Sequence, residues 1–401
     1  MAMLFETATL GPLALRNRVI KAATFEGMSP EGVVTPDLIE FHRRVAAGGT
    51  AMTTVAYLAV APEGRTDVSN VLLVPGAVEG LRRLTDAVHD EGALVSAQIG
   101  HAGPVANARS NRAQSVTPGR MFNPLSLRRS RAATEYDIAR ITDDYRRGAS
   151  YCRAAGFDAI EVHLGHNYLL SSFLSPLLNR RDDRWGGTLE NRARFARQVV
   201  AAVRDGAGSS MAVTAKLNMT DGVPRGFDVD ESLEFATMLE HDRHLDALEL
   251  TGGSSLANPM YLFRGAAPVK EFTATLPWFL RPAFRLIGTR FLREYPYEEA
   301  YFREQAERFR DELDLPVILL GGISRLDTAE EAVADGFGFV AMGRALLHDP
   351  DLIAQWRAGT SDRSGCIHCN RCMPTIYTGT RCPLVDPKPG DRPIAMSTGP
   401  R

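Results

Sequence analysis

The chain has 401 residues, of which 44% are hydrophobic and 23% are charged, and its 46 basic and 48 acidic side chains leave a net charge of −2. This near-neutral balance gives no electrostatic reason to expect a nucleic acid or an anionic membrane as the main partner. The N-terminal stretch MAMLFETATLGPLALRNRV lacks the basic and apolar regions of a secretory signal, and no window of about 18 residues is apolar throughout, so we expect a cytoplasmic protein without a transmembrane segment.

Eight short runs of β-branched or apolar residues recur along the chain. They cover residues 18–23, 50–57, 93–100, 159–165, 212–218, 247–253, 316–322 and 338–343. Segments with helical spacing lie between most of them, at 34–49, 76–90, 137–155, 188–205, 230–243, 297–313 and 326–335. Apolar strands that alternate with amphipathic helices predict a buried parallel sheet. Eight such units favour an α/β fold closed into a (β/α)8 TIM barrel over an open, doubly wound sheet.

Two stretches interrupt this alternation. Residues 101–135 are basic and rich in Asn, Ser, Pro and Gly, which predicts a long loop after the third strand. Residues 257–295 form a long insertion after strand six, in which aromatic residues alternate with arginines. We expect the insertion to be a lid for a hydrophobic substrate. The alternatives are a segment that touches a membrane surface, and a packed subdomain or an interface between subunits of a homo-oligomer.

The domain organisation follows from these segments. We expect a barrel over residues 1–360 that includes the 257–295 insertion, followed by a Cys-containing C-terminal extension over 361–401. The tail after about Asp386 is rich in Pro and Gly, which predicts disorder.

Polar or glycine residues end all eight predicted strands, where barrels of this kind place their active sites. They are Thr24, Tyr57, Gln98 with His101, His163 with His166 and Tyr168, Lys216, Gly252 with Gly253, Gly321 with Gly322, and Gly343 with Arg344. The glycines after strands seven and eight let backbone N–H groups approach a phosphate, to which Arg344 adds a charge. The alternative is that these glycines only make tight turns.

The end of strand four, EVHLGHNYLLSSFLSP, concentrates further chemistry. His163 and His166 can donate hydrogen bonds to a carbonyl oxygen, and Tyr168 can serve as a proton donor. Two alternatives are polar residues that only satisfy a turn, and a metal site, for which no third ligand lies nearby in the sequence.

The run EVHLGHNYLLSSFLSPLLNRRDDRWGGTLENRARF resembles the strand-four signature of the Old Yellow Enzyme family. NRVIKAAT, AQIGHAG, VILLGGI and FVAMGRALLHDP resemble the same family at the first, third, seventh and eighth strands, so the similarity spans roughly residues 3–358.

The resemblance implies FMN, held without a covalent bond. It assigns Ala22, Ala23 and Thr24 to the isoalloxazine edge, Gln98 to the pyrimidine ring, and Tyr57 to a position beside the flavin. Gly322, Gly343 and Arg344 are assigned to the phosphate. Gly252 and Gly321 complete the set of cofactor-binding residues. Lys216 stands where the family usually has Arg. A lysine keeps a cation near flavin N1 and O2, which favours the anionic reduced flavin, but it loses the fork geometry of a guanidinium.

The implied reaction is an ene-reduction. NAD(P)H gives hydride to the flavin, which passes it to the β-carbon of an α,β-unsaturated carbonyl compound, while His163 and His166 stabilise the oxygen and Tyr168 protonates the α-carbon. Alternatives are an FMN-linked dehydrogenase or demethylase, a flavin-binding redox sensor or electron carrier, and an aldolase-like barrel for a phosphorylated substrate.

Four of the five cysteines fall in CIHCNRCMPTIYTGTRC, as Cys366, Cys369, Cys372 and Cys382. Four thiolates at such spacing can ligate a [4Fe–4S] cluster, and zinc or a metal-free remnant are the alternatives. The segment also resembles the cluster motif after the barrel in the 2,4-dienoyl-CoA reductase and trimethylamine dehydrogenase branch of the family. It departs from that branch in its shorter last gap and in lacking the second flavin and nucleotide domains that the cluster serves there.

Overall fold

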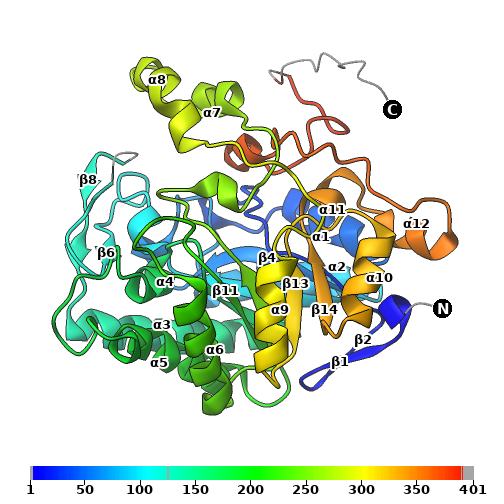
Figure 1. Cartoon of the computed structure of the whole chain (residues 1–401), viewed down its shortest axis with the longest axis horizontal. Helices are drawn as coiled ribbons and strands as arrows, with labels where there is room; N and C mark the ends of the chain where they lie inside the picture. The colour runs from blue at the N-terminus through cyan, green and yellow to red at the C-terminus, as the bar shows by residue number, and fades with distance from the viewer. Residues whose placement is uncertain (1–2, 124–125, 390, 392–401) are drawn as a thin grey trace.

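The computed structural model describes residues 3–123, 126–389 and 391 (Figure 1). Most of the tail that the sequence predicts to be disordered, residues 390 and 392–401, lies outside the described residues.

Eight parallel strands close into a barrel in the order β10-β11-β12-β13-β14-β3-β4-β5. Their bounds are β3 Val19–Lys21, β4 Met52–Ala59, β5 Leu94–Gly100, β10 Ala159–Leu164, β11 Ala212–Asn218, β12 Ala247–Thr251, β13 Val317–Leu320 and β14 Phe339–Met342. All eight runs identified in the sequence are strands of this barrel, so the predicted fold is confirmed. Almost every strand residue is buried, as expected of a parallel sheet that is covered on both faces.

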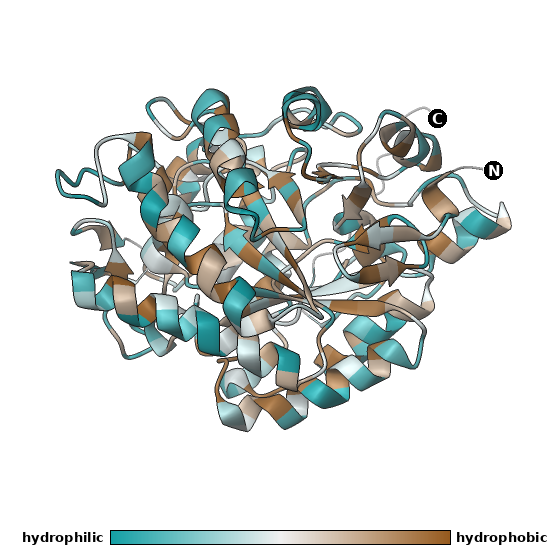
Figure 2. Cartoon of the chain, turned by 90° about the horizontal axis from the view of Figure 1, so that it is seen from below, coloured by the Kyte–Doolittle hydropathy of each residue, from teal (hydrophilic) through white to brown (hydrophobic). Residues whose placement is uncertain are grey.

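Helices follow the strands and surround the barrel. They are α1 Pro36–Ala47, α2 Val78–His89, α3 Glu135–Ala154, α4 Leu169–Leu174, α5 Leu189–Ala207, α6 Val229–Asp242, α9 Arg303–Glu312, α10 Leu326–Ala334, α11 Arg344–His348 and α12 Leu352–Ala358. In Figure 2 the helices carry most of the hydrophilic residues, and hydrophobic residues gather on the central strands. Among the described residues, no helix has both the length and the apolar character needed to cross a membrane.

Capping side chains set the start of the two long helices, α3 and α5. The Thr134 side chain accepts a hydrogen bond from the Asp137 N–H, and the Asp137 carboxylate accepts one from the Thr134 N–H in return. The Thr188 side chain accepts a hydrogen bond from the Asn191 N–H at the start of α5. Each bond satisfies an N–H group that the first turn of a helix leaves without a partner.

A short hairpin closes the amino-terminal end of the barrel. Strands β1 (Ala8–Leu10) and β2 (Leu13–Leu15) pair antiparallel. Leu10 and Leu15 are fully buried in one cluster with Ala159, Ala212 and Ala247, which are the first residues of three barrel strands. Because this end is plugged by apolar side chains, access to the barrel interior is left to the opposite rim.

The two stretches that interrupt the alternation contain small structures of their own. Residues 101–135 carry two short sheets, one formed by β6 (Val116–Thr117) with β9 (Arg131–Ala132) and one by β7 (Phe122–Asn123) with β8 (Arg128–Arg129). Residues 257–295 contain α7 (Val269–Thr275) and α8 (Arg281–Phe291), which stand away from the β1–β2 hairpin across the molecule (Figure 1). The buried side chains of the insertion form a separate cluster of Met260, Phe272, Leu276, Phe284 and Leu292.

The core between α4 and α5 offers a stability test. The Phe195 ring is fully buried, with its centroid 5.0 Å from that of Phe173. We expect Phe195→Ala to lower the free energy of unfolding by about 3–5 kcal/mol, because it removes apolar contacts and leaves a cavity. Urea unfolding followed by circular dichroism measures this loss. The control is Phe122→Ala, since the Phe122 side chain is 57% exposed and its removal should change stability by no more than about 0.5 kcal/mol. Equal losses in the two variants would contradict the prediction.

Candidate active site at the carboxyl end of the barrel

A tight turn after β10 begins the site. His166 and Asn167 both have φ near +59°, a left-handed conformation that costs energy for residues other than glycine. The turn reverses the chain, so that Tyr168 returns over the end of the strand it has just left.

The Asp221 carboxylate holds this turn in place. It accepts hydrogen bonds from the Asn167 and Asn218 side-chain amides at 3.0 and 3.1 Å and from the Ser175 hydroxyl at 2.6 Å. Asp221 is buried, and burial raises the pKa of its carboxyl group. The sequence analysis missed Asp221, because its importance depends on partners that come from three different loops and strands.

Four rings gather where β10 ends. The ring centroids of His163 and Tyr168 lie 4.4 Å apart, and those of His163 and His166 lie 5.1 Å apart. The Tyr57 ring stands edge-on to Tyr168 at 5.5 Å, and its hydroxyl donates to the Gly64 carbonyl at 2.8 Å. The structure thus brings together the three residues predicted to be catalytic and one of those predicted to lie beside the flavin.

The two histidines and Tyr168 are uncharged at neutral pH and can donate hydrogen bonds in that state. Burial, with Lys216 and a second imidazole nearby, lowers the pKa of His163 well below its ordinary value, and burial lowers the pKa of His166 to about 3. Both imidazoles are therefore neutral at pH 7. His163 Nδ1 accepts from the Gly165 N–H at 3.1 Å, which leaves its proton on Nε2 as a donor. Burial also raises the pKa of Tyr168, so its hydroxyl keeps its proton.

Below the rings, the barrel interior carries a buried set of charges. Lys216 Nζ lies 3.0 Å from the Glu161 carboxylate and 2.8 Å from the Glu249 carboxylate, and Gln98 Nε2 donates to Glu161 at 2.6 Å. The two carboxylates raise the pKa of Lys216 against the opposing effect of burial. Burial and the neighbouring Glu161 raise the pKa of Glu249. The sequence predicted Lys216 and Gln98 as site residues but not the two glutamates, which lie on β10 and β12 and become site residues only because both contact Lys216.

The residues assigned to the isoalloxazine edge follow β3. Ala22 is buried and its N–H donates to the Met342 carbonyl, and Ala23 packs against the apolar cluster that contains Tyr57. Thr24 is half-buried, and its hydroxyl oxygen accepts a hydrogen bond from Lys21 at 2.8 Å.

The glycines after β13 and β14 differ in their surroundings. Gly321 and Gly322 have φ of +121° and +80°, and a side chain at either position would collide with the rings of Phe302 or Tyr301. A Cβ at Gly343 would meet only the Thr24 methyl group, at 3.7 Å, so the backbone is open there. Gly252 is buried against the Tyr261 ring of the insertion.

Free donors lie at the same rim. The backbone N–H groups of Gly322, Gly343 and Arg344 have no hydrogen-bond acceptor among the described residues. The Arg344 guanidinium donates to the Arg264 carbonyl at 2.9 Å and to the Asn370 side chain. Exposed N–H groups beside an arginine are the features that bind a phosphate group.

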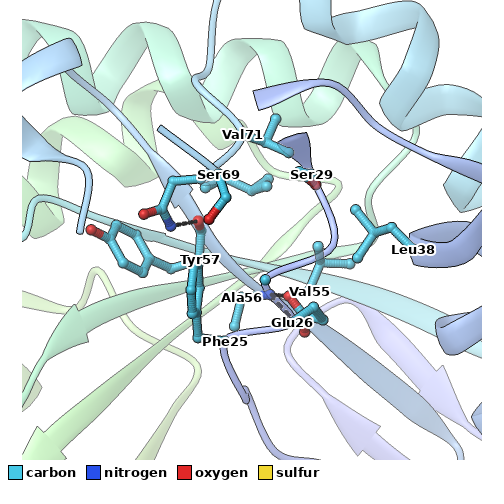
Figure 3. A pocket seen from close by; sticks show the side chains of 12 residues that line it. Phe25, Glu26, Ser29, Leu38, Val55, Ala56, Tyr57, Ser69 and Val71 are labelled. Atoms are coloured by element: carbon cyan, nitrogen blue, oxygen red, sulfur yellow. Dashed lines mark hydrogen bonds between the residues drawn. The ribbon is translucent and has the colours of Figure 1, made fainter. Parts of the chain in front are cut away.

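A small pocket is lined by β4, by Leu38 of α1 and by the segments 25–29 and 69–71, and Tyr57 forms part of its wall (Figure 3). Phe25, Glu26, Leu38 and Val71 are among its lining residues, and the Glu26 carboxylate accepts from the Ala56 N–H at 3.1 Å. Polar and apolar side chains share its walls, and the buried Glu26 supplies a carboxylate among them.

The C-terminal extension packs on the insertion and the rim. The His368 ring stacks on the Tyr297 ring with centroids 3.4 Å apart, and the Tyr297 hydroxyl donates to the Gly322 carbonyl at 2.6 Å. Met373 packs in the apolar cluster of the insertion. The extension therefore lies directly beside the proposed phosphate loop.

The four cysteines of the extension are free thiols. Burial raises the pKa of Cys372 to about 12, and the other three cysteines add to that increase, so all four lie within electrostatic reach of one another. No three histidine, cysteine or carboxylate side chains in the described part of the chain are arranged around a common point as ligands of a metal ion.

The closed barrel, with its polar rim and the donor cluster formed by His163, His166 and Tyr168, defines an FMN-dependent oxidoreductase of the Old Yellow Enzyme type. A family model described as the NADH:flavin oxidoreductase / NADH oxidase family matches residues 3–251, and the chain belongs to this family.

The chain is similar to two curated relatives whose names give different activities. The chain is 55% identical over 383 residues to the 4,4'-dithiodibutanoate disulfide reductase of Rhodococcus erythropolis, covering 96% of this chain and 95% of that protein. It is 31% identical over 380 residues to a metal reductase of Desulforamulus reducens, covering 94% of this chain and 52% of that protein.

Solved structures share the fold. 2-Naphthoyl-CoA reductase superposes with a TM-score of 0.82 at 24% identity, over 96% of this chain and 57% of that chain. Morphinone reductase superposes with a TM-score of 0.70 at 24% identity, over 91% of this chain and 93% of that chain. The chain thus spans a little more than half the length of the metal reductase and of the naphthoyl-CoA reductase chain.

The buried histidine predicts a pH dependence of stability. The folded-state pKa of His166, about 3, lies below the ordinary value of 6.5, so between these values the unfolded chain binds a proton that the folded chain does not. Stability should therefore fall as the pH drops below 6.5, by about 1.4 kcal/mol per pH unit for this residue. Between pH 6.5 and 5, we expect the free energy of unfolding of His166→Asn to fall by about 2 kcal/mol less than that of the native chain.

Urea unfolding at the two pH values measures this difference. The matched control is His241→Asn, whose exposed side chain stays in water in both states and should leave the native slope unchanged. An unchanged slope in His166→Asn would contradict the buried, neutral state of this imidazole.

Proposed function

We propose that this chain binds FMN at the barrel rim and uses NAD(P)H to reduce a small organic disulfide. The observation that carries the proposal is the cluster of neutral donors at the end of β10, His163, His166 and Tyr168. The choice of a disulfide is supported by the relative that is 55% identical over nearly its whole length and is named for reducing 4,4'-dithiodibutanoate.

The residues at the rim fit FMN. Gly343 leaves open backbone beside Thr24, the free N–H groups of Gly322 and Arg344 suit a phosphate, and Gln98 and Lys216 offer polar groups for the pyrimidine ring. Bound FMN supplies the step that no side chain can perform, which is to accept hydride from NAD(P)H and deliver two electrons to the second substrate.

The net reaction balances as NAD(P)H plus a proton plus RSSR, giving NAD(P)⁺ and two RSH. The S–S bond breaks and each sulfur atom gains one electron. The Nε2–H of His163 hydrogen-bonds to the sulfur on which negative charge develops, and His166 binds the same region of the substrate. Tyr168 donates its proton to the departing sulfur.

Reduction of an activated C=C bond is the second candidate. The same three donors suit an enone oxygen and the protonation of its α-carbon, and a relative that is 27% identical is named multifunctional alkene reductase/demethylase OYE, from Caballeronia cordobensis. In this reaction the histidines hold the carbonyl oxygen and Tyr168 protonates carbon.

The insertion acts as a lid in this proposal. Its apolar cluster, centred on Met260, Phe272 and Phe284, is a compact unit, and Arg344 at the rim donates to its Arg264 carbonyl. A packed unit that is attached to the rim can cover the bound substrate and exclude water from it.

We propose further that Cys366, Cys369, Cys372 and Cys382 hold a [4Fe–4S] cluster. All four cysteines lie in one short segment of the extension, and their C-x2-C-x2-C-x9-C spacing supports a common site.

Anaerobic rapid mixing tests the proposed function. The FMN-loaded protein is reduced with NADH or NADPH and then mixed with 4,4'-dithiodibutanoate or with cyclohexenone. In a separate experiment the oxidised FMN-loaded protein is mixed with dimethylglycine. Fast reoxidation by the disulfide with release of two thiols supports the first proposal, and fast reoxidation by the enone alone supports the second. Reduction of the flavin by the amine but not by NAD(P)H would overturn both in favour of a dehydrogenase. Reduction by NAD(P)H without reoxidation by either acceptor would favour an electron carrier.

Removal of the Tyr168 hydroxyl tests its role as proton donor. We expect Tyr168→Phe to slow reoxidation by the substrate about 100-fold or more, because it removes a positioned general acid. Reduction of the flavin by NAD(P)H should change little. Tyr136→Phe is the control, since the Tyr136 side chain is 74% exposed on α3 and belongs to no predicted site. The assignment fails if reoxidation is equally fast in Tyr168→Phe and the native enzyme.

Metal analysis tests the cluster. We expect about four iron and four sulfide per chain in protein purified without oxygen, and Cys369→Ser should lose most of both. Cys152→Ser is the control, because Cys152 is fully buried in α3, outside the segment that carries the other cysteines. One zinc per chain and no sulfide, or no metal, would overturn the proposal.

A further inference from the structure

A second group of buried charges lies behind β3, outside the donor cluster. Lys21 and His42 are fully buried, and Glu26 is 3% exposed. The Glu26 carboxylate lies 3.5 Å from Lys21 Nζ and 3.4 Å from His42 Nε2, and His42 Nδ1 lies 2.8 Å from the Thr53 hydroxyl. None of these residues belongs to the predicted site.

A buried ammonium group is costly, and here the compensation is incomplete. Burial lowers the pKa of Lys21 to about 8, and Glu26 only partly opposes this effect. Lys21 Nζ also lies 4.9 Å from the centroid of the Phe41 ring. An apolar residue at position 21 would avoid the cost of desolvating a charge, so stability does not explain this lysine.

The hydrogen bond from Lys21 offers an explanation. Lys21 Nζ donates to the Thr24 hydroxyl oxygen at 2.8 Å. This bond uses a lone pair of that oxygen, so the hydroxyl proton must point elsewhere, and it has no acceptor among the described residues. Thr24 is half-buried at the rim, and its methyl group faces the open backbone of Gly343. The hydroxyl is thus held as a donor beside the place proposed for the flavin.

We propose that Lys21 is a positioning residue for the flavin, which orients and strengthens the Thr24 hydroxyl as a hydrogen-bond donor to the isoalloxazine edge and thereby favours reduced over oxidised FMN. The inference rests on the proposed FMN site. The chemical reason is that reduction adds negative charge to the isoalloxazine ring system, and a donor that is itself hydrogen-bonded to a cation stabilises that charge more than a free hydroxyl does.

The binding of FMN in its two redox states provides the test. Apoprotein is titrated with oxidised FMN and, without oxygen, with reduced FMN, and the ratio of the two dissociation constants is compared between variants. We expect Lys21→Met to shift this ratio about tenfold against reduced FMN, as the loss of one charge-assisted hydrogen bond predicts. Lys21→Gln retains an uncharged N–H donor on a side chain one atom shorter and should recover part of the shift.

Two further variants address the charge on Lys21 and the folding of the variants. Glu26→Gln keeps the bond from Lys21 to Thr24 but removes the carboxylate that favours the charged form of Lys21, so it should shift the ratio in the same direction as Lys21→Met and by less. Lys21→Met combined with Glu26→Gln removes the charge that Lys21→Met alone would leave buried, so it serves if the single variant fails to fold. It should show the full tenfold shift.

The double variant with Thr24→Val decides whether Lys21 acts through Thr24. We expect Lys21→Met to produce no further shift once the hydroxyl is absent. Equal shifts with and without the Thr24 hydroxyl, or a native ratio in Lys21→Met, would overturn the inference. Failure of the native protein to bind FMN at all would instead refute the proposed function, which keeps the two failures distinct.

Discussion

Closure of a parallel sheet forces all eight strands to end at one rim, and the chemistry of this protein depends on that constraint. The opposite end is filled by Leu10 and Leu15 of the N-terminal hairpin, together with the alanines that begin three strands. Polar side chains that follow the strands are therefore brought together even though they are hundreds of residues apart in sequence. Thr24 and Gly343 face each other at this rim because β3 and β14 are neighbours in the closed sheet.

The rim is supported by buried charges that would be unfavourable singly. Lys216 is held between two carboxylates, and Lys21 shares Glu26 with His42. Inside a closed barrel that excludes water, each such charge must find its partner on a neighbouring strand or helix. The imidazoles of His163 and His166 stay neutral because they are buried, so the site combines uncharged donors at the rim with charged groups beneath and behind them.

The insertion and the C-terminal extension complete the rim from outside. Arg344 joins the two, since it donates to a backbone carbonyl of the insertion and to the Asn370 side chain of the extension. The His368 ring, stacked on Tyr297, continues this contact toward Gly322. The cysteine segment therefore does not stand apart from the barrel, and a redox group held there would lie beside the loop proposed to bind the flavin phosphate.

The sequence by itself determined the alternation of strands and helices, and with it the barrel. A strand that is buried on both faces has a continuous apolar run, which can be recognised directly in the sequence. It also determined which residues end the strands, among them His163, His166, Tyr168 and Lys216. Only the tertiary structure decided the partners of those residues. Asp221, Glu249 and the Lys21–Glu26–His42 group resemble ordinary charged residues in the sequence, and they became significant when closure of the barrel buried them. A hydrophobic pattern indicates which side chains are buried. The pairing of buried charges depends instead on distances between strands and helices, and only the closed barrel sets those distances.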